Sequence, residues 1–194
     1  FTDTQSITQE QYGVWAQLLD DAVTVYPDAD FIVHTGDFVD HGDGFLQWKW
    51  GLNAASDNLM SMALMPTAGN HEAYGTYALD NYFALSDGNL AIPQYTDTGA
   101  YYSYDYNNAH FIVLNTNDVP DDKLSDEQIE WMKADAQASD AEWKFVMLHK
   151  APYSNGSHVE DSDVEGFRAL MDGVFGEGKC IVLRIRPEGA VRIA

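Results

Sequence analysis

Cysteine and basic residues are scarce in this sequence of 194 residues. Its only cysteine is Cys180, so no disulfide can form within the chain, and a zinc site built from several thiolates is ruled out. Lysine and arginine together number 10, against 31 aspartate and glutamate residues, which gives a formal net charge of -21. Because so acidic a surface repels phosphate backbones, we expect no role as a nucleic-acid scaffold.

Long apolar runs are missing as well. No segment approaches the roughly 20 apolar residues of a transmembrane helix, so we expect no membrane span. The chain begins with Phe1 and shows neither an initiator methionine nor the basic and apolar regions of a signal peptide, so we expect any targeting signal to be absent or already removed. The length and the 45% of hydrophobic residues predict one globular domain over residues 1–194.

Short apolar runs alternate with helical patterns along the chain. We expect strands at 30–33, 63–66, 101–106, 111–114 and 144–148, and the end of another strand at the first residues. Helices are expected from 45 to 62, from Ser125 onward, and over the pattern Val14, Leu18, Leu19, Ala22 and Val25. Asn107-Asn108 predicts the turn of an antiparallel hairpin. The combination predicts an α/β fold with mixed β-sheets flanked by helices.

The end of the chain, residues 168–194, differs in composition from the rest. It holds all four arginines, whereas every earlier basic residue is a lysine. Either this atypical tail is a frameshifted, truncated or recombined end, or it is an ordinary basic strand. Composition over so short a window favours neither alternative.

Polar clusters directly follow several of the expected strands. They are Asp3-Thr4-Gln5, Gly36 to Asp40, Gly69-Asn70-His71-Glu72, and His149. Ligands of α/β sheets bind at the carboxyl ends of strands, so these clusters are expected to converge in space. Carboxylate, amide and imidazole groups together suit hard or borderline divalent metals. Each cluster alone is as typical of a helix cap or turn, but their joint occurrence favours a metal site.

The order of these clusters resembles the motifs of the calcineurin-like metallophosphoesterases, and within them of bacterial proteins similar to purple acid phosphatases. Those motifs are an early aspartate, GDxx, GNH[DE], a lone histidine and GHxH. Gly69-Asn70-His71-Glu72 is the most specific match, and the segment from His149 to His158 is also similar. The resemblance implies a metallophosphoesterase-type αββα sandwich of mixed sheets, which we expect to be incomplete at both ends.

The same resemblance implies an activity and a set of metal ligands. It implies a phosphoesterase in which two metal ions, of manganese, iron or zinc, activate water against a small phosphate ester. Asp3 would bind one metal, Asp37 would bridge both, and Asn70 and His149 would bind the second. The family alone favours an extracytoplasmic or secreted location, and the residues themselves leave the compartment open.

Other implied roles concern the surroundings of the metals. His71 and His158 would face the substrate phosphate as catalytic groups. Glu72 would support the ligands by orienting an imidazole. Asp40 stands where the purple enzymes have the tyrosine that colours the ferric site, so no such chromophore is expected. Gln5 stands where many members have a histidine, and its carbonyl oxygen is a possible but weaker ligand.

The GHxH motif has no counterpart, because no histidine follows His158. Our hypothesis is that this polypeptide binds metal weakly or at one site only. The alternative function is therefore a catalytically impaired or inactive phosphoesterase-fold domain that binds metal or phosphate without turnover. Tyrosines near the motifs either line the cleft or pack in the fold, and packing is the commoner role. These tyrosines are Tyr74, Tyr77, Tyr82 and Tyr153.

Overall fold

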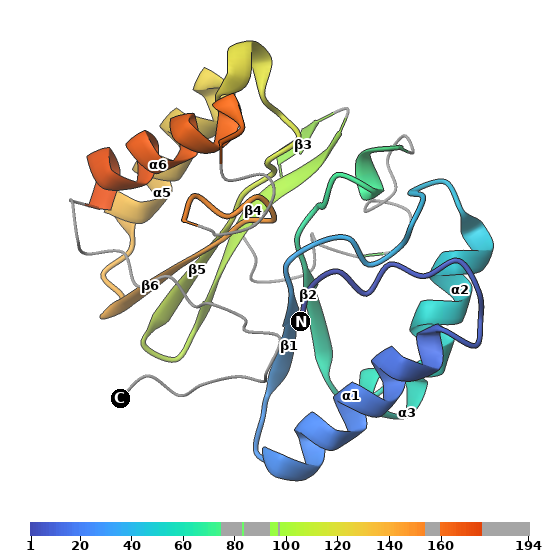
Figure 1. Ribbon diagram of the computed structural model, residues 1–194. Coiled ribbons are helices and arrows are strands. Elements are labelled where there is room, and N and C mark those ends of the chain that lie inside the picture. The colour runs from blue at the N-terminus through green and yellow to red at the C-terminus, as the bar shows by residue number, and fades with distance from the viewer. Residues whose placement is uncertain (75–82, 84–93, 97, 154–159, 176–194) are drawn as a thin grey trace. The chain divides into compact units, whose positions relative to one another are not determined.

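The structure is a computed structural model that describes residues 1–74, 83, 94–96, 98–153 and 160–175. The chain divides into two compact units, Phe1–Lys150 and Ala151–Ala194, and each is treated by itself. Figure 1 labels the helices and strands. No helix in the described ranges is both long enough and apolar enough to cross a membrane.

A short parallel sheet lies at the centre of the first unit. Strand β1 (Phe31–His34) pairs with β2 (Ala63–Pro66), and helices α2 (Phe45–Ala54) and α3 (Ser56–Leu59) connect them. The expected strands are confirmed, while the expected single helix from 45 to 62 is broken at Ala55. Because β1 and β2 run in parallel, the loops that follow them start from the same edge of the sheet (Figure 1).

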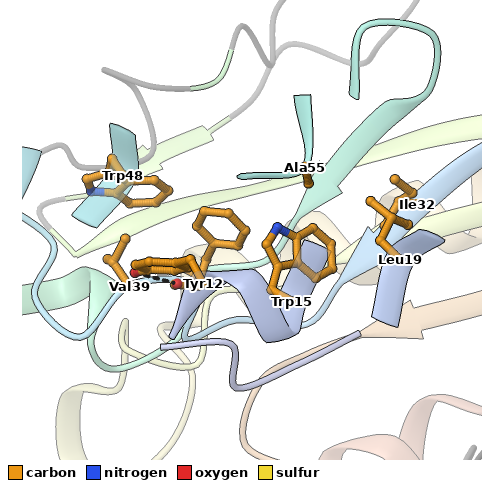
Figure 2. Close-up of a cluster of buried hydrophobic side chains, with 9 residues drawn as sticks. Tyr12, Trp15, Leu19, Ile32, Val39, Trp48 and Ala55 are labelled. Atoms are coloured by element: carbon orange, nitrogen blue, oxygen red, sulfur yellow. Dashed lines mark hydrogen bonds between the residues drawn. The ribbon is translucent and has the colours of Figure 1, made fainter. Parts of the chain in front are cut away.

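Helix α1 (Tyr12–Val25) and helix α2 cover one face of this sheet. Figure 2 shows Tyr12, Trp15 and Leu19 of α1 in one cluster with Ile32 of β1. The cluster also includes Phe38, Val39, Trp48, Ala55 and Ala68. The helix is where the sequence predicts it, but several residues of the apolar pattern that predicted it are solvent-exposed. Those exposed side chains are Val14, Leu18 and Val25. The aromatic rings of α1 fill the core instead.

The second sheet of this unit has four strands in the order β3-β4-β5-β6. They are β3 (Gln94–Thr96), β4 (Gly99–Tyr106), β5 (Ala109–Val113) and β6 (Trp143–Met147). Strands β4 and β5 form the predicted antiparallel hairpin, and Asn107 in its turn has a positive φ of 53°. Strand β6 pairs with β5 in parallel, so this sheet is mixed.

Aromatic side chains pack the two sheets of the first unit against each other. The Phe31 ring on β1 meets Tyr104 edge-on at 5.8 Å and Phe111 at 5.5 Å, measured between ring centroids. The Tyr102 hydroxyl, which is fully buried, donates a hydrogen bond of 2.7 Å to the Pro66 carbonyl at the end of β2. These contacts fix the carboxyl end of β2 relative to the four-stranded sheet.

Helix α5 (Asp126–Ala138) covers the outer face of the four-stranded sheet. It begins at Ser125, as predicted, and the Ser125 hydroxyl accepts a hydrogen bond from the Gln128 amide, which caps the first turn. Its Trp131 ring packs on Tyr101 of β4 at 4.9 Å. The unit therefore has the predicted order of layers, with helices outside two mixed or parallel sheets.

A buried histidine joins this helix to the hairpin. His110 Nδ1 lies 2.6 Å from Asp105 Oδ1, and His110 Nε2 lies 2.7 Å from Asp135 Oδ2 on α5. Ser103 Oγ donates to the other oxygen of Asp135 at 2.8 Å. Both ring nitrogens of His110 thus have carboxylate partners, so this histidine is a structural residue of the outer layer.

The second unit contains helix α6 (Ser162–Phe175), which the expected helices did not include. Arg168 on α6 donates from Nε to the Pro152 carbonyl at 3.0 Å, and its guanidinium lies 5.6 Å from the Tyr153 ring centroid. The Tyr153 hydroxyl donates to Asp172 at 2.5 Å. The first part of the atypical tail is therefore helical, and residues 176–194 lie outside the described residues.

Replacement of the buried Trp48 tests how much the core contributes to the stability of the first unit. The side chain is fully buried, its ring stacks on Phe38 at 5.7 Å, and its indole N–H donates to the Gly42 carbonyl at 2.8 Å. We expect Trp48→Ala to lower the free energy of unfolding by about 3–5 kcal/mol in a denaturant titration. Trp143→Ala, at a side chain 51% exposed, is the matched control and should change it by less than about 1 kcal/mol. Equal losses in both variants would contradict the described core.

Candidate metal centre

The loops after β1, β2 and β6 bring three predicted ligands together. His149 Nε2 lies 3.3 Å from Asp37 Oδ2 and 3.1 Å from Asn70 Oδ1. His149 Nδ1 lies 2.9 Å from the Thr35 carbonyl, which can only accept, so Nδ1 carries the proton of the neutral ring. This leaves the Nε2 lone pair directed at the two oxygens. Three electron-rich atoms converge, and such a set requires a cation or a proton among them.

Asp3 joins the same group. One ligand atom each of Asp3, Asp37 and His149 lies within 4.8 Å of the others. The Asp3 amide donates to the Gly36 carbonyl at 3.0 Å, which holds the first polar cluster beside the loop after β1. Both aspartates have positive φ, 54° for Asp3 and 55° for Asp37. This conformation is uncommon for residues with a Cβ and is often found at functional sites.

Gln5 follows in the same segment, and its amide donates to the Asp37 carbonyl at 2.9 Å. Its side-chain oxygen is buried and has no hydrogen-bond partner within the described part of the chain. A buried carbonyl without a partner costs free energy, and a bound cation would supply the missing interaction. The donor set therefore fits a hard or borderline metal ion.

Two glycines allow the loops to approach each other. A Cβ on Gly69 would lie 2.1 Å from Asp37 Oδ1 and 2.2 Å from the Asp37 nitrogen. A Cβ on Gly36 would lie 2.7 Å from His149 Nδ1 and 2.8 Å from the Gly69 backbone, and Gly36 has a φ of 103°. Any side chain at these positions would displace a candidate ligand.

Glu72, the last residue of the second loop's motif, binds backbone amides of both loops. Its Oε2 accepts from the Asp37 and Gly69 amides at 2.8 Å each, and its Oε1 accepts from Phe38 at 2.9 Å and Val39 at 3.1 Å. Glu72 is 2% exposed. The sequence predicted that this carboxylate orients an imidazole, but its described hydrogen bonds position the ligand loops instead. We call this arrangement the Glu72 clamp.

The predicted catalytic residue His71 is held at two points. Its amide donates to Asp37 Oδ1 at 3.0 Å, and its Nδ1 donates to the Asp40 backbone carbonyl at 2.6 Å. The Asp40 carboxylate is more distant, at 3.7 Å. The Nδ1 contact leaves Nε2 as the ring atom available to a substrate. The other predicted catalytic residue, His158, lies outside the described residues.

The charges of the centre shift two pKa values. Burial raises the pKa of Asp37, but the hydrogen bond and charge of His149 outweigh this and bring it below its ordinary value. Burial lowers the pKa of His149, yet the Asp37 carboxylate raises it above its ordinary value. Nearby His34 is different: burial lowers its pKa to about 3, so its ring is neutral, and it hydrogen-bonds to the Thr4 hydroxyl as a neighbour of the site.

Sequence reasoning missed Asn117. Its side-chain amide donates to the Gly69 carbonyl at 2.9 Å and to Asn115 Oδ1 at 3.1 Å. The contact restrains the loop that carries Asn70. The signal was present, because Asn115-Thr116-Asn117 is another polar cluster that follows a strand, β5, after Leu114.

Comparisons with known proteins bear on the family and the fold of the chain. The sequence profile of the calcineurin-like phosphoesterases matches residues 1–175. The chain belongs to the calcineurin-like phosphoesterase family. The match includes Arg168 and the rest of α6, so the part of the atypical tail up to 175 lies within the family match.

A solved structure shares the fold of this calcineurin-like phosphoesterase. It is purple acid phosphatase PPD1 from yellow lupin (Lupinus luteus) seeds, with a TM-score of 0.65 and 18% sequence identity. The similarity covers 89% of this chain but 34% of the lupin chain, so the chain spans about a third of that protein's length. No curated protein sequence gave a match.

The close approach of the two loops predicts a severe effect of Gly69→Ala on metal binding. Because the added methyl group would overlap Asp37, we expect the affinity for Mn²⁺ or Zn²⁺ to fall more than about tenfold in a calorimetric titration. Gly13→Ala on α1 is the control, since nothing lies within 4 Å of its Cβ. It should leave metal affinity unchanged and raise the free energy of unfolding by about 0.5–1 kcal/mol. Wild-type metal affinity in Gly69→Ala would contradict the described approach.

The pairing of Asp37 with His149 predicts how metal-free stability depends on pH. The Asp37 contribution is present above the ordinary pKa of 3.8 and is lost as pH falls through its lower folded pKa. The His149 contribution is present below 6.5 and is lost as pH rises through its higher folded pKa.

Denaturant titrations in the presence of a chelator measure this dependence, with Asp37→Asn as the comparison. The difference in unfolding free energy between wild type and variant should be largest between about pH 4 and pH 6.5 and shrink on either side. A difference that does not vary with pH would show that the two side chains do not form an ion pair in the metal-free protein.

Proposed function

We propose that this chain carries the phosphoesterase centre of a metal-dependent hydrolase that cleaves small phosphate esters. The observation that carries the proposal is that oxygens of Asp37 and Asn70 lie 3.3 Å and 3.1 Å from His149 Nε2, beside Asp3. Family membership supplies the reaction class, and the lupin neighbour's name, a phosphatase, supports a phosphate ester as substrate.

The proposed centre is dinuclear, with manganese, iron or zinc as the metals. Asp37 would bridge the ions, Asp3 would hold one, and Asn70 and His149 would hold the other. Gln5 offers a carbonyl oxygen that has no hydrogen-bond partner among the described residues. When bound, such metals polarise the phosphoryl group and make a nucleophile of water near neutral pH. The net charge of -21 does not oppose an anionic substrate there, because the ions dominate the local field.

The chain's own residues would bind the phosphate and move a proton. His71, whose Nδ1 is fixed on the Asp40 carbonyl, presents Nε2 to the substrate. Water would add to phosphorus and leave its protons on the released phosphate, the bond from phosphorus to the leaving oxygen would break, and His71 would give a proton from Nε2 to that oxygen. His158 is proposed as a second group on the phosphate. The Glu72 clamp keeps the Asp37 loop in place through its backbone amides.

The second candidate is the same centre without turnover, capturing a metal or a phosphate. The observation that favours it is that the described residues contain one group of three ligand atoms, Asp3, Asp37 and His149. This candidate predicts one ion per chain or weak binding.

Reconstitution with defined metals tests the proposal. The chain is stripped with a chelator, resupplied with Mn²⁺, Fe²⁺ or Zn²⁺, and assayed with p-nitrophenyl phosphate and bis(p-nitrophenyl) phosphate. We expect metal-dependent turnover that Asp37→Asn lowers more than about 100-fold, since loss of a direct ligand exceeds the effect of a supporting residue.

Asp57→Asn, at an exposed residue of α3, is the matched control and should retain activity. Counting bound ions by elemental analysis separates the two candidates. No turnover with any metal, in protein shown to be folded and to hold one ion, would replace the proposal by the binding-only alternative.

A further inference from the structure

An exposed aromatic ring lies beside the proposed proton donor. Tyr74 is 56% exposed, so it is not a core side chain. Its ring centroid lies 5.1 Å from that of His71, at an interplanar angle of 66°, and 5.5 Å from that of His41, at 39°. We call these three residues the ring cluster. It joins the loop after β1, which carries His41, to the loop after β2.

The backbone holds the ring cluster together. The Gly42 amide donates to the His71 carbonyl at 2.9 Å, and the Tyr74 amide donates to the same carbonyl at 3.3 Å. The His41 ring is itself restrained, because Nδ1 lies 2.5 Å from Asp43 Oδ1. Tyr74 thus stands at a defined distance from the His71 ring even though its own surface is open to solvent.

The position of Tyr74 suits contact with the leaving group. In the proposed pose the leaving oxygen meets His71 Nε2, and the Tyr74 ring lies 5.1 Å from the His71 ring between centroids, within reach of a leaving group bound there. Aromatic rings attract one another in offset or edge-to-face geometry at centroid distances of about 4.5–7 Å. An aromatic alcohol in this position would gain a contact that an aliphatic one lacks.

The charge near the ring cluster restricts the leaving group further. Residues 36–44 and 69–74 contain no lysine or arginine. The side chains of Asp40 and Asp43 are 43% and 71% exposed, so their carboxylates border the cluster. Polyphosphate or other anionic leaving groups would be repelled here, in contrast to the metal centre.

We propose that Tyr74 selects phosphate esters of neutral aromatic alcohols. The proposal rests on the proposed function, because it places His71 at the leaving oxygen. Three substrates test this selection: phenyl phosphate, 2-glycerol phosphate and ATP. Their leaving groups differ in aromatic character and in charge.

Steady-state kinetics of wild type, Tyr74→Ala and Tyr74→Phe test the proposal. Tyr74→Ala should raise KM for phenyl phosphate by about 2- to 10-fold, as loss of one aromatic pair implies. Its KM for 2-glycerol phosphate should not change. Tyr74→Phe keeps the ring and should behave as wild type with phenyl phosphate. ATP should be the poorest substrate of the three for wild type.

A binding measurement keeps this inference separable from the proposed function. Calorimetry with metal-loaded protein compares phenylphosphonate and methylphosphonate, which are not hydrolysed. We expect wild type to prefer phenylphosphonate and Tyr74→Ala to lose the preference. If this preference is observed but the protein hydrolyses none of the esters, the proposed function is wrong and the recognition by Tyr74 is still supported.

Other outcomes overturn the inference. If wild type turns over both esters and Tyr74→Ala loses both equally, the ring has a structural role and the selection is wrong. If wild type prefers neither phosphonate, or binds neither, Tyr74 is not a recognition residue. Thermal melting of each variant confirms that the compared proteins are folded.

Discussion

The structure of the candidate site depends on one buried carboxylate. Glu72 accepts hydrogen bonds from four backbone amides, three in the loop after β1 and one in the loop after β2. Although burial raises the pKa of Glu72, both of its carboxylate oxygens accept from two amides each, so the buried amides of both loops are satisfied at once. The clamp therefore fixes the Asp37 backbone, including its unfavourable positive φ, without using any candidate ligand for the purpose.

The clamp works because the fold brings the loops to one edge. The parallel pairing of β1 with β2 starts both loops side by side, and the Phe31 and Tyr102 contacts fix this short sheet on the four-stranded one. Glycines at 36 and 69 then let the backbones touch. His149 follows β6, and the Thr35 carbonyl orients its ring. Thr35 and Asp37 both follow β1, so the end of this one strand positions both His149 and Asp37.

Much of the fold and of the candidate site was predictable, because the strands are short apolar runs and the motifs stand at their ends. Ala63 to Pro66 is the predicted strand without change, and the convergence of Asp37, Asn70 and His149 followed from the strand-end rule. The features that the sequence did not predict depend on tertiary contacts. Periodicity alone could not show that Trp15 rather than Leu18 faces the sheet, or that Glu72 meets amides from residues more than 30 positions away.

The contact between the loops of Gly36 and Gly69 also limits where residues can be inserted in the chain. At the edge of the β1–β2 sheet that carries the motifs, the backbones of the Gly36 and Gly69 loops are already in contact. One added residue there would separate amides that share the Glu72 carboxylate. At the opposite ends, residues 26–30 before β1 and the Asn107-Asn108 turn are exposed. Insertions and circular permutation should be accepted there, so relatives of this fold are expected to diversify in length on one side of the sheets and in chemistry on the other.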